Sequence, residues 1–254
     1  MSGGGSAAPR DWDAGTYHRV SDVHTEWASQ VLGRMEPADV VLDAGCGSGR
    51  VTAMLLERCR HVIAVDAAPS MVEHAREALG DRATVYQQNL LELSLPEPVD
   101  AAFSNAVFHW VPDHPRLFSR LHAALKPGGQ LEAQYGGYGN VERFHEAASA
   151  VGSEEPFAEY LDGWVGPWNF TTDSQASGWL EDAGFVDVRA WLETWPMTPR
   201  EPRDYIRTVC LGHHLQKLPS EDLRRAYVDA VADRLGDPME IDYVRLNISA
   251  RRAG

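Results

Sequence analysis

The feature that most constrains this chain is an apolar segment that runs into a glycine loop and is followed by a second apolar segment ending in an acid. The first segment and its loop are residues 40–49 (VVLDAGCGSG), and the second is residues 62–66 (VIAVD). This order predicts two neighbouring parallel strands whose carboxyl ends meet at a crevice, where nucleoside ligands bind. Glycine permits the sharp turn and lets a ligand approach the backbone closely.

Strands and helices are predicted to alternate along the first half of the chain. Apolar runs predict strands at 40–45, 61–66, 83–87, 99–104 and 130–135, and helical periodicity predicts helices at 50–59, from Pro69, and from Asp113 to the glycines at 126–129 (KPGG). Two more strands are predicted at 185–197 and 240–250. Such alternation favours right-handed crossovers. We therefore expect an α/β fold with a Rossmann-like, seven-stranded, mostly parallel sheet and helices on both faces.

The remaining segments are predicted to form a small helical lid. Helical patterns cover residues 11–35, 140–151, 201–217 and 220–235, whereas 157–170 is rich in Trp, Pro and Gly. We expect a disordered tail at 1–10 and a single domain over 11–254, with lid elements at about 11–35, 140–172 and 200–236.

The charge and the cysteine content of the chain limit the kinds of molecule it is expected to bind and the compartment it is expected to occupy. The chain has 37 acidic and 23 basic residues and a formal net charge of −14, so neither nucleic acid nor an anionic membrane is expected as a partner. The start lacks the pattern of a signal peptide. Three widely spaced cysteines suit a reducing compartment. We expect a cytoplasmic protein that acts on a small molecule, with a monomer and a homodimer both open.

The spacing of the glycines discriminates between nucleoside ligands. A dinucleotide-binding loop requires G-x-G-x-x-G, but Arg50 occupies the place of the third glycine. A P-loop requires Gly-Lys-Ser/Thr, which does not follow. The pattern is instead D-x-G-x-G-x-G, in which Asp43 can serve the ammonium group of a ligand.

On these residues the chain resembles the class I S-adenosylmethionine (SAM) methyltransferases. The runs 103–114 (FSNAVFHWVPDH) and 127–129 (PGG), leading to 134–140 (QYGGYGN), are similar to a subgroup that includes trans-aconitate and juvenile-hormone-acid-type methyltransferases. The resemblance covers about residues 12–140 and is only architectural beyond them. It implies SAM as cofactor and S-adenosylhomocysteine as product.

Each part of SAM requires its own binding groups in the crevice. Gly45 and Gly47 are expected to offer backbone amides, and Asp43 a negative charge, to the amino acid end of the cofactor. Asp66 is placed to accept hydrogen bonds from the ribose diol or to cap the helix that follows, and both roles can hold at once.

The adenine and the sulfonium are assigned to the ends of later strands. Asn89 and Leu90 stand where the family often has an Asp after the third strand. They are expected to form hydrogen bonds with the edge of the adenine. The remaining cofactor candidates are Ala67 and Met71, which would line the ring, and Ser104 and Asn105, which follow the fourth strand beside the methyl group.

His109 is the candidate general base, because an imidazole pKa near 6.5 suits proton removal at neutral pH. A contact with the cofactor or a structural role is the alternative. No metal is expected, because the adjacent His213 and His214 have no Cys or carboxylate ligands at fixed spacing. The acceptor pocket is predicted to use polar and aromatic side chains, namely Tyr17, His18, Tyr135, Tyr138, Trp164, Trp168, Trp195 and Tyr205.

The function that follows is SAM-dependent methyl transfer to a small molecule by in-line displacement. Carboxylate, hydroxyl and amine acceptors all remain open. Two alternatives are a SAM-binding protein of the same fold that does not transfer methyl groups and a nicotinamide-dependent oxidoreductase.

Overall fold

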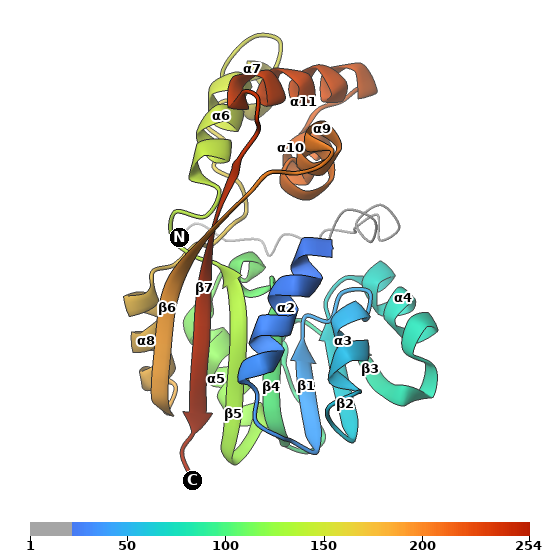
Figure 1. Ribbon diagram of the computed structural model, residues 1–254, viewed down its shortest axis with the longest axis vertical. Helices are drawn as coiled ribbons and strands as arrows, with labels where there is room; N and C mark the ends of the chain where they lie inside the picture. Colours follow the sequence, from blue (N-terminus) through green and yellow to red (C-terminus); the bar gives the residue numbers. More distant parts are fainter. Residues whose placement is uncertain (1–21) are drawn as a thin grey trace, which may run out of the picture.

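The computed structural model describes residues 22–254, with side chains from Trp27 onward, and is built on one seven-stranded sheet (Figure 1). The strand order is β3-β2-β1-β4-β5-β7-β6. The strands are β1 (Val40–Ala44), β2 (His61–Asp66), β3 (Ala83–Gln87), β4 (Val99–Asn105), β5 (Leu125–Gly136), β6 (Phe185–Met197) and β7 (Ile241–Arg252). The first five are parallel, whereas β7 is antiparallel to both β5 and β6. The predicted Rossmann-like, mostly parallel sheet is confirmed.

Helices cover both faces of this sheet. One face carries α2 (Asp22–Arg34), α3 (Arg50–Leu55) and α4 (Pro69–Leu79), and the other carries α5 (His114–Ala124) and α8 (Asp173–Asp182). Within β1, Val41 belongs to the core under α2 and α3, and Leu42 belongs to the core under α5. Burial on both faces explains why the strands are continuously apolar.

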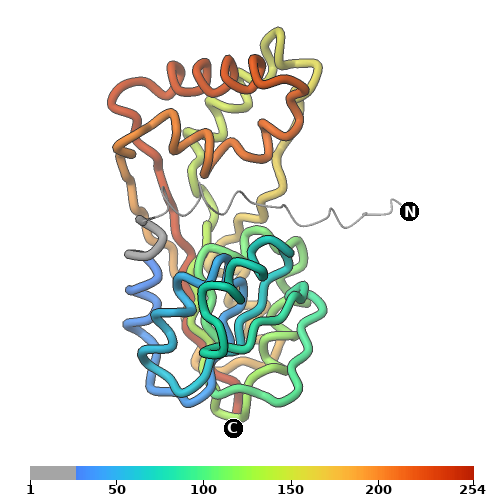
Figure 2. The backbone as a smooth tube through the Cα atoms, turned by 90° about the vertical axis from the view of Figure 1, so that its right-hand side faces the viewer, coloured from blue at the N-terminus to red at the C-terminus, as the bar shows by residue number. Residues whose placement is uncertain are grey.

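A further layer of helices stands beyond the carboxyl ends of the parallel strands (Figures 1 and 2). This helical cap consists of α6 (Glu142–Gly152), α7 (Ala158–Leu161), α9 (Pro202–Tyr205), α10 (Gly212–Lys217) and α11 (Glu221–Leu235), and it has a core of its own. Strands β6 and β7 extend from the sheet into the cap, where Met197 pairs with Ile241. No helix of the described chain has the length and apolar character needed to cross a membrane.

Local capping follows the sequence closely. The Asp113 carboxylate accepts a hydrogen bond from the Arg116 amide at the start of α5, and the Ser220 hydroxyl accepts one from the Leu223 amide at the start of α11. Pro69 opens α4. These interactions satisfy amides that have no partner inside the helix.

Three element boundaries differ from the sequence-based predictions. The helix predicted at 50–59 ends at Leu55, and the one predicted at 201–217 is interrupted by a π-helix, Ile206–Cys210, in which the Leu211 amide donates to the Ile206 carbonyl at 2.7 Å. Helix α5 ends at Ala124, before the Lys-Pro-Gly-Gly segment at 126–129, because Leu125 already pairs with Val99 of β4 and the register then shifts. Residues 11–21 of the first predicted helix lie outside the described residues.

Arg34 fixes α2 to the sheet. Its guanidinium donates to the Glu132 carboxylate at 2.9 Å, to the Asn247 side chain at 2.9 Å and to the Ala133 carbonyl at 3.1 Å. The Ser249 hydroxyl donates to the other Glu132 oxygen at 2.6 Å. A buried carboxylate is tolerated when it is paired and hydrogen-bonded in this way.

Replacing Arg34 with Ala should destabilise the fold, because it leaves the buried Glu132 carboxylate without its cation. We expect the free energy of unfolding, measured by urea denaturation, to fall by roughly 3 kcal/mol. Arg60→Ala is the matched control, since Arg60 faces Asp39 at 4.0 Å and both side chains are largely exposed. Equal losses in the two variants would contradict this account of Arg34.

Candidate functional site

The glycine loop between β1 and α3 is shaped by left-handed backbone conformations. Gly45, Gly47 and Gly49 have φ angles of +94°, +53° and +85°. A Cβ on Gly45 would lie 2.3 Å from a Val107 methyl carbon, whereas a Cβ on Gly47 would have no neighbour within 4 Å. Gly45 is therefore required by packing, and Gly47 borders open space that a ligand can enter.

The amides of this loop are already hydrogen-bonded, which corrects the expectation that Gly45 and Gly47 offer them to a ligand. The Gly45 amide donates to the Val65 carbonyl at 2.8 Å, and the Gly47 amide donates to the Asp66 carboxylate at 2.9 Å. Both acceptors lie at the end of β2, so the loop and this strand end are held together. The two glycines contribute conformation and clearance.

Asp66 joins three elements at the edge of the crevice. One carboxylate oxygen accepts from Gly47, and the other accepts from the amide of Ala68, the N-cap residue of α4, at 2.9 Å. Burial raises the pKa of Asp66, and the hydrogen bonds from the Ala68 and Gly47 amides oppose this shift. Each carboxylate oxygen has a second lone pair, so the geometry leaves room for a ribose hydroxyl to donate as well.

Asp43 lies beneath the glycine loop and is only 2% exposed. The Thr52 hydroxyl of α3 donates to its carboxylate at 2.7 Å. Burial raises the pKa of Asp43 to about 7, Thr52 opposes the shift, and the nearby Asp66 charge adds to it. A cation that entered the crevice would favour the ionised form of this carboxyl group.

The candidates for adenine recognition follow β2 and β3 in the chain. Met71 is buried against Ala68 at the start of α4. Asn89 caps a short 3-10 helix, η2 (Leu90–Glu92), through a hydrogen bond from the Leu91 amide at 2.9 Å, and Leu90 is buried in the core under α5. Asn89 therefore has a structural role besides any contact with a ligand.

The end of β4 is strained and tightly bonded. The Ser104 hydroxyl donates to the Ala44 carbonyl at 2.7 Å and so joins β4 to β1. Asn105 pairs with Gln134 of β5. Ala106 follows with φ +62°, an uncommon conformation for a residue other than glycine.

His109 lies on the 3-10 helix η3 (Phe108–Trp110), and its Nδ1 accepts a hydrogen bond from the Gly136 amide at 3.2 Å. Because an amide can only donate, Nδ1 carries no proton, and the neutral ring must carry its hydrogen on Nε2. Neither nitrogen can then take up a proton while this bond persists. This geometry favours His109 as a hydrogen-bond donor, and its role as a general base stays a prediction.

The aromatic residues predicted for the acceptor pocket fall into two separate groups. Trp168 lies with Trp110 and Phe170 next to His109, at ring-centroid distances of 6.0 Å from Trp110 and 6.4 Å from Phe170. The second group is elsewhere in the cap core, where Trp195 packs edge-on against Trp27 and the Tyr205 and Tyr243 hydroxyls are 2.6 Å apart. Trp164 joins the first group at 6.0 Å from Trp168.

Tyr135 and Tyr138 do not belong to either group. Tyr135 is fully buried in the core under α5, 5.4 Å from the Phe108 ring, and its acceptor role stays a prediction. Tyr138 is 63% exposed. Tyr17 and His18 lie outside the described residues, so their placement stays a prediction.

Sequence reasoning missed His145 of α6 and Phe170, and it considered His213 and His214 only as metal ligands. The His145 ring lies 4.5 Å from Trp168 and 5.8 Å from Phe170, and the His214 ring lies 5.8 Å from Trp168. Within the part of the chain that the structure describes, no group of three His, Cys, Asp or Glu residues could hold a metal ion. Nothing in the sequence relates His145 to His214, because the folding of the cap brings them together.

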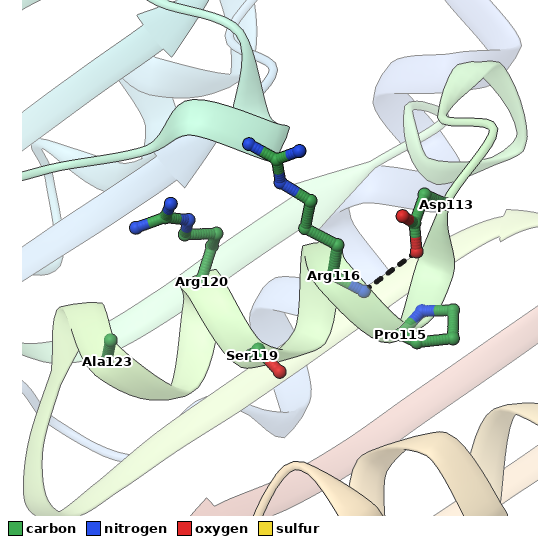
Figure 3. Close-up of a pocket in the computed structure, with 6 residues that line it drawn as sticks. All are labelled: Asp113, Pro115, Arg116, Ser119, Arg120 and Ala123. Carbon is green, nitrogen blue, oxygen red and sulfur yellow. Dashed lines mark hydrogen bonds between the residues drawn. The ribbon is translucent and has the colours of Figure 1, made fainter. Parts of the chain in front are cut away.

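A shallow surface depression along α5 is not part of this site (Figure 3). It is lined by Asp113, Pro115, Arg116, Ser119, Arg120 and Ala123. The Asp113 side chain there is engaged in capping the helix, and none of the residues predicted to bind cofactor or acceptor lines the depression.

The chain is similar to known methyltransferases. Residues 42–133 match a family model described as a methyltransferase domain. The chain is 31% identical to a trans-aconitate 2-methyltransferase of Azoarcus sp. over 86% of this chain and 87% of that protein. It is 30% identical to an uncharacterized methyltransferase of Schizosaccharomyces pombe over 74% of this chain and 81% of that protein.

A solved structure shares the fold at lower identity. A phosphoethanolamine N-methyltransferase of Haemonchus contortus, in complex with phosphomonomethylethanolamine and S-adenosylhomocysteine, superposes with a TM-score of 0.61 at 21% identity. The match covers 95% of this chain and 57% of that one, so this chain spans little more than half of its length.

Asp43 should make the stability of the ligand-free protein depend on pH. Its folded-state pKa of about 7 lies above the ordinary value of 3.8, so the folded protein retains a proton that the unfolded chain has released. The contribution of Asp43 to stability should therefore decrease as the pH rises from about 4 to about 7. Urea denaturation across this range should show a flatter profile for Asp43→Asn, and parallel profiles would refute the assignment.

Asp66→Ala should weaken SAM binding by about tenfold or more, because it removes the expected acceptor for the ribose and releases the Gly47 and Ala68 amides. Calorimetry measures the affinity. Asp100→Ala is a control carboxylate at the opposite end of the sheet, where it binds Lys126. An unchanged affinity of Asp66→Ala for SAM would rule out the ribose role.

Proposed function

Because this chain belongs to the class I SAM-dependent methyltransferases, we propose that it methylates a carboxylate of a small organic acid. The chain is an enzyme that uses SAM as its cofactor. Membership of this family also rules out the nicotinamide-dependent oxidoreductase considered above. The proposal concerns the acceptor, for which the similarity to a trans-aconitate 2-methyltransferase offers support.

The hydrogen bond between the Gly136 amide and His109 is the observation that carries this proposal. A carboxylate is ionised at neutral pH and attacks without losing a proton, whereas an alcohol, a phenol or an ammonium group must first be deprotonated. A histidine that presents Nε2–H suits the first class of acceptor. It can donate a hydrogen bond to the attacking carboxylate and orient it, but it cannot remove a proton from an alcohol, a phenol or an ammonium group.

We assign the cofactor to the crevice at the ends of β1 and β2. Asp66 would hold the ribose, Asp43 would stabilise the ammonium end, and Gly47 would give clearance. The adenine would lie beside Ala67, Met71, Asn89 and Leu90, and the sulfonium beside Ser104 and Asn105, through backbone or packing contacts where their side chains are engaged.

When bound, SAM supplies a methyl group on a positively charged sulfur, which departs as the methyl carbon is attacked in line. The protein contributes orientation and exclusion of water. His109 holds the acceptor oxygen, and Trp110, Trp168 and Phe170 form apolar surfaces beside it.

We further propose that the cap acts as a lid over a single domain. The lid role predicted for residues 11–35 does not extend to α2, which packs on the sheet, and for residues 11–21 it stays a prediction. Trp164 and Trp168 are the described acceptor candidates that lie near His109. The roles of Tyr17, His18, Tyr138, Trp195 and Tyr205 remain predictions, as do a cytoplasmic location and the exclusion of nucleic acid as a substrate. The net charge of −14 supports the last of these.

The acceptor class can be tested with SAM that carries a labelled methyl group. The purified protein would be incubated with trans-aconitate, with a phenol and with a primary amine, and the products separated by mass spectrometry. We expect label in a methyl ester that mild base hydrolyses. Label confined to base-stable products would overturn the carboxylate proposal, and no transfer to any acceptor would favour a SAM-binding protein that does not methylate.

Kinetics of His109 variants should separate a donor from a base. His109→Ala should reduce kcat/KM for the carboxylate by about tenfold to a hundredfold, because a hydrogen bond to a charged group is lost. His109→Gln should recover part of this loss, since an amide NH can still donate. SAM affinity serves as the control for folding. Two results together would show that His109 is a general base. The Gln variant would be as slow as the Ala variant, and the activity of the wild-type protein would rise with pH as the imidazole loses its proton.

A further inference from the structure

We propose that His145 and His214 form a binding site for a second anionic group of the acceptor, which makes the substrate a small di- or tricarboxylate. This inference rests on the proposed carboxyl methylation and adds a recognition site in the cap. The site joins α6, which carries His145, to α10, which carries His214.

Both histidines converge on Trp168. The Trp168 ring lies 4.5 Å from His145 and 5.8 Å from His214, and the neighbouring His213 is 6.0 Å away. The indole belongs to the segment between α7 and α8, so three separate parts of the cap meet here. Their convergence produces a cluster of imidazoles with aromatic walls.

Each of the two histidines has a buried nitrogen without a hydrogen-bond partner among the described residues. The atoms are Nε2 of His145 and Nδ1 of His214, and the His214 residue is only 5% exposed. Buried polar atoms nearly always have a partner in folded proteins. Two such atoms around one indole therefore indicate a place for a polar ligand.

The chemistry of the surroundings favours an anion. The described residues offer no group of ligands that could hold a metal ion. Lys217 lies 5.3 Å above the Trp164 ring, and the same ring packs 4.6 Å from His214, so a positive charge stands next to the cluster. An imidazole can donate to a carboxylate when neutral and attracts it more strongly when protonated.

The cluster is within reach of the proposed reaction centre. The Phe170 ring lies 5.9 Å from His109 and 5.8 Å from His145, so one aromatic side chain separates the two imidazoles. An acceptor whose reacting carboxylate is held by His109 can direct a second carboxylate towards His145. A monocarboxylate leaves this second site empty.

Binding should be coupled to proton uptake. Burial lowers the pKa of His145 to about 4, and Asp242 of β7 opposes the shift. Burial also lowers the pKa of His214 to about 3, with further lowering by His145 and His213. The other polar neighbours are Lys217 and Tyr227, whose ring lies 5.7 Å from His214. A bound carboxylate raises the pKa of both histidines, so affinity should increase as the pH falls towards about 4, the pKa of His145 before binding.

The test is calorimetry on the full-length protein saturated with S-adenosylhomocysteine. trans-Aconitate is the tricarboxylate probe and crotonate the monocarboxylate probe. His145→Gln and His214→Gln are the variants, and His122→Gln, at the end of α5 against Phe185, is the matched control. Affinity for S-adenosylhomocysteine verifies that each variant is folded.

We expect each variant to weaken trans-aconitate binding by about tenfold or more and to leave crotonate and S-adenosylhomocysteine binding unchanged. The wild-type protein should take up protons when trans-aconitate binds, as seen in buffers of different ionisation enthalpy. Unchanged trans-aconitate affinity in both variants, or an equal loss for crotonate, overturns the site. If methyl esters form but the variants bind normally, only this inference fails. If trans-aconitate binds through the histidines but is never methylated, only the proposed reaction fails.

Discussion

The carboxylate of Asp66 is the interaction on which the crevice depends. Its two oxygens accept from the Gly47 amide and the Ala68 amide, and the adjacent Val65 carbonyl accepts from Gly45. One strand end thus fixes both the glycine loop and the start of α4. These hydrogen bonds hold the loop in one conformation, which lowers the cost of ordering it on binding.

The same arrangement explains which nucleoside the crevice can accept. Asp43 and Asp66 are close enough for the charge of one to raise the pKa of the other. A pyrophosphate would add negative charge to this pair, whereas an ammonium group would relieve their repulsion. Electrostatics therefore favour a cofactor with a cationic amino acid end, in agreement with the family to which the chain belongs.

Local patterns predicted the sheet and several caps, because β-strand periodicity and helix capping depend on neighbours in sequence. The strand at 83–87 and the cap at Asp113 are examples. What the sequence could not reveal depends on distant partners. The amide that donates to His109 comes from Gly136, and the imidazoles of His145 and His214 meet only when α6 and α10 pack around Trp168. The interruption of the helix at Ile206–Cys210 likewise has no local pattern.

The distribution of charge suits a reaction in which charge disappears. A sulfonium and a carboxylate are both ionised before transfer, and a thioether and an ester are neutral after it. A site of low dielectric favours the less charged transition state, provided that binding energy from elsewhere brings the ions together. Acids at the ends of β1 and β2 and histidines in the cap can supply that energy from opposite sides. In the proposed site, the apolar rings of Trp110, Trp168 and Phe170 lie between these two sets of groups and would exclude water.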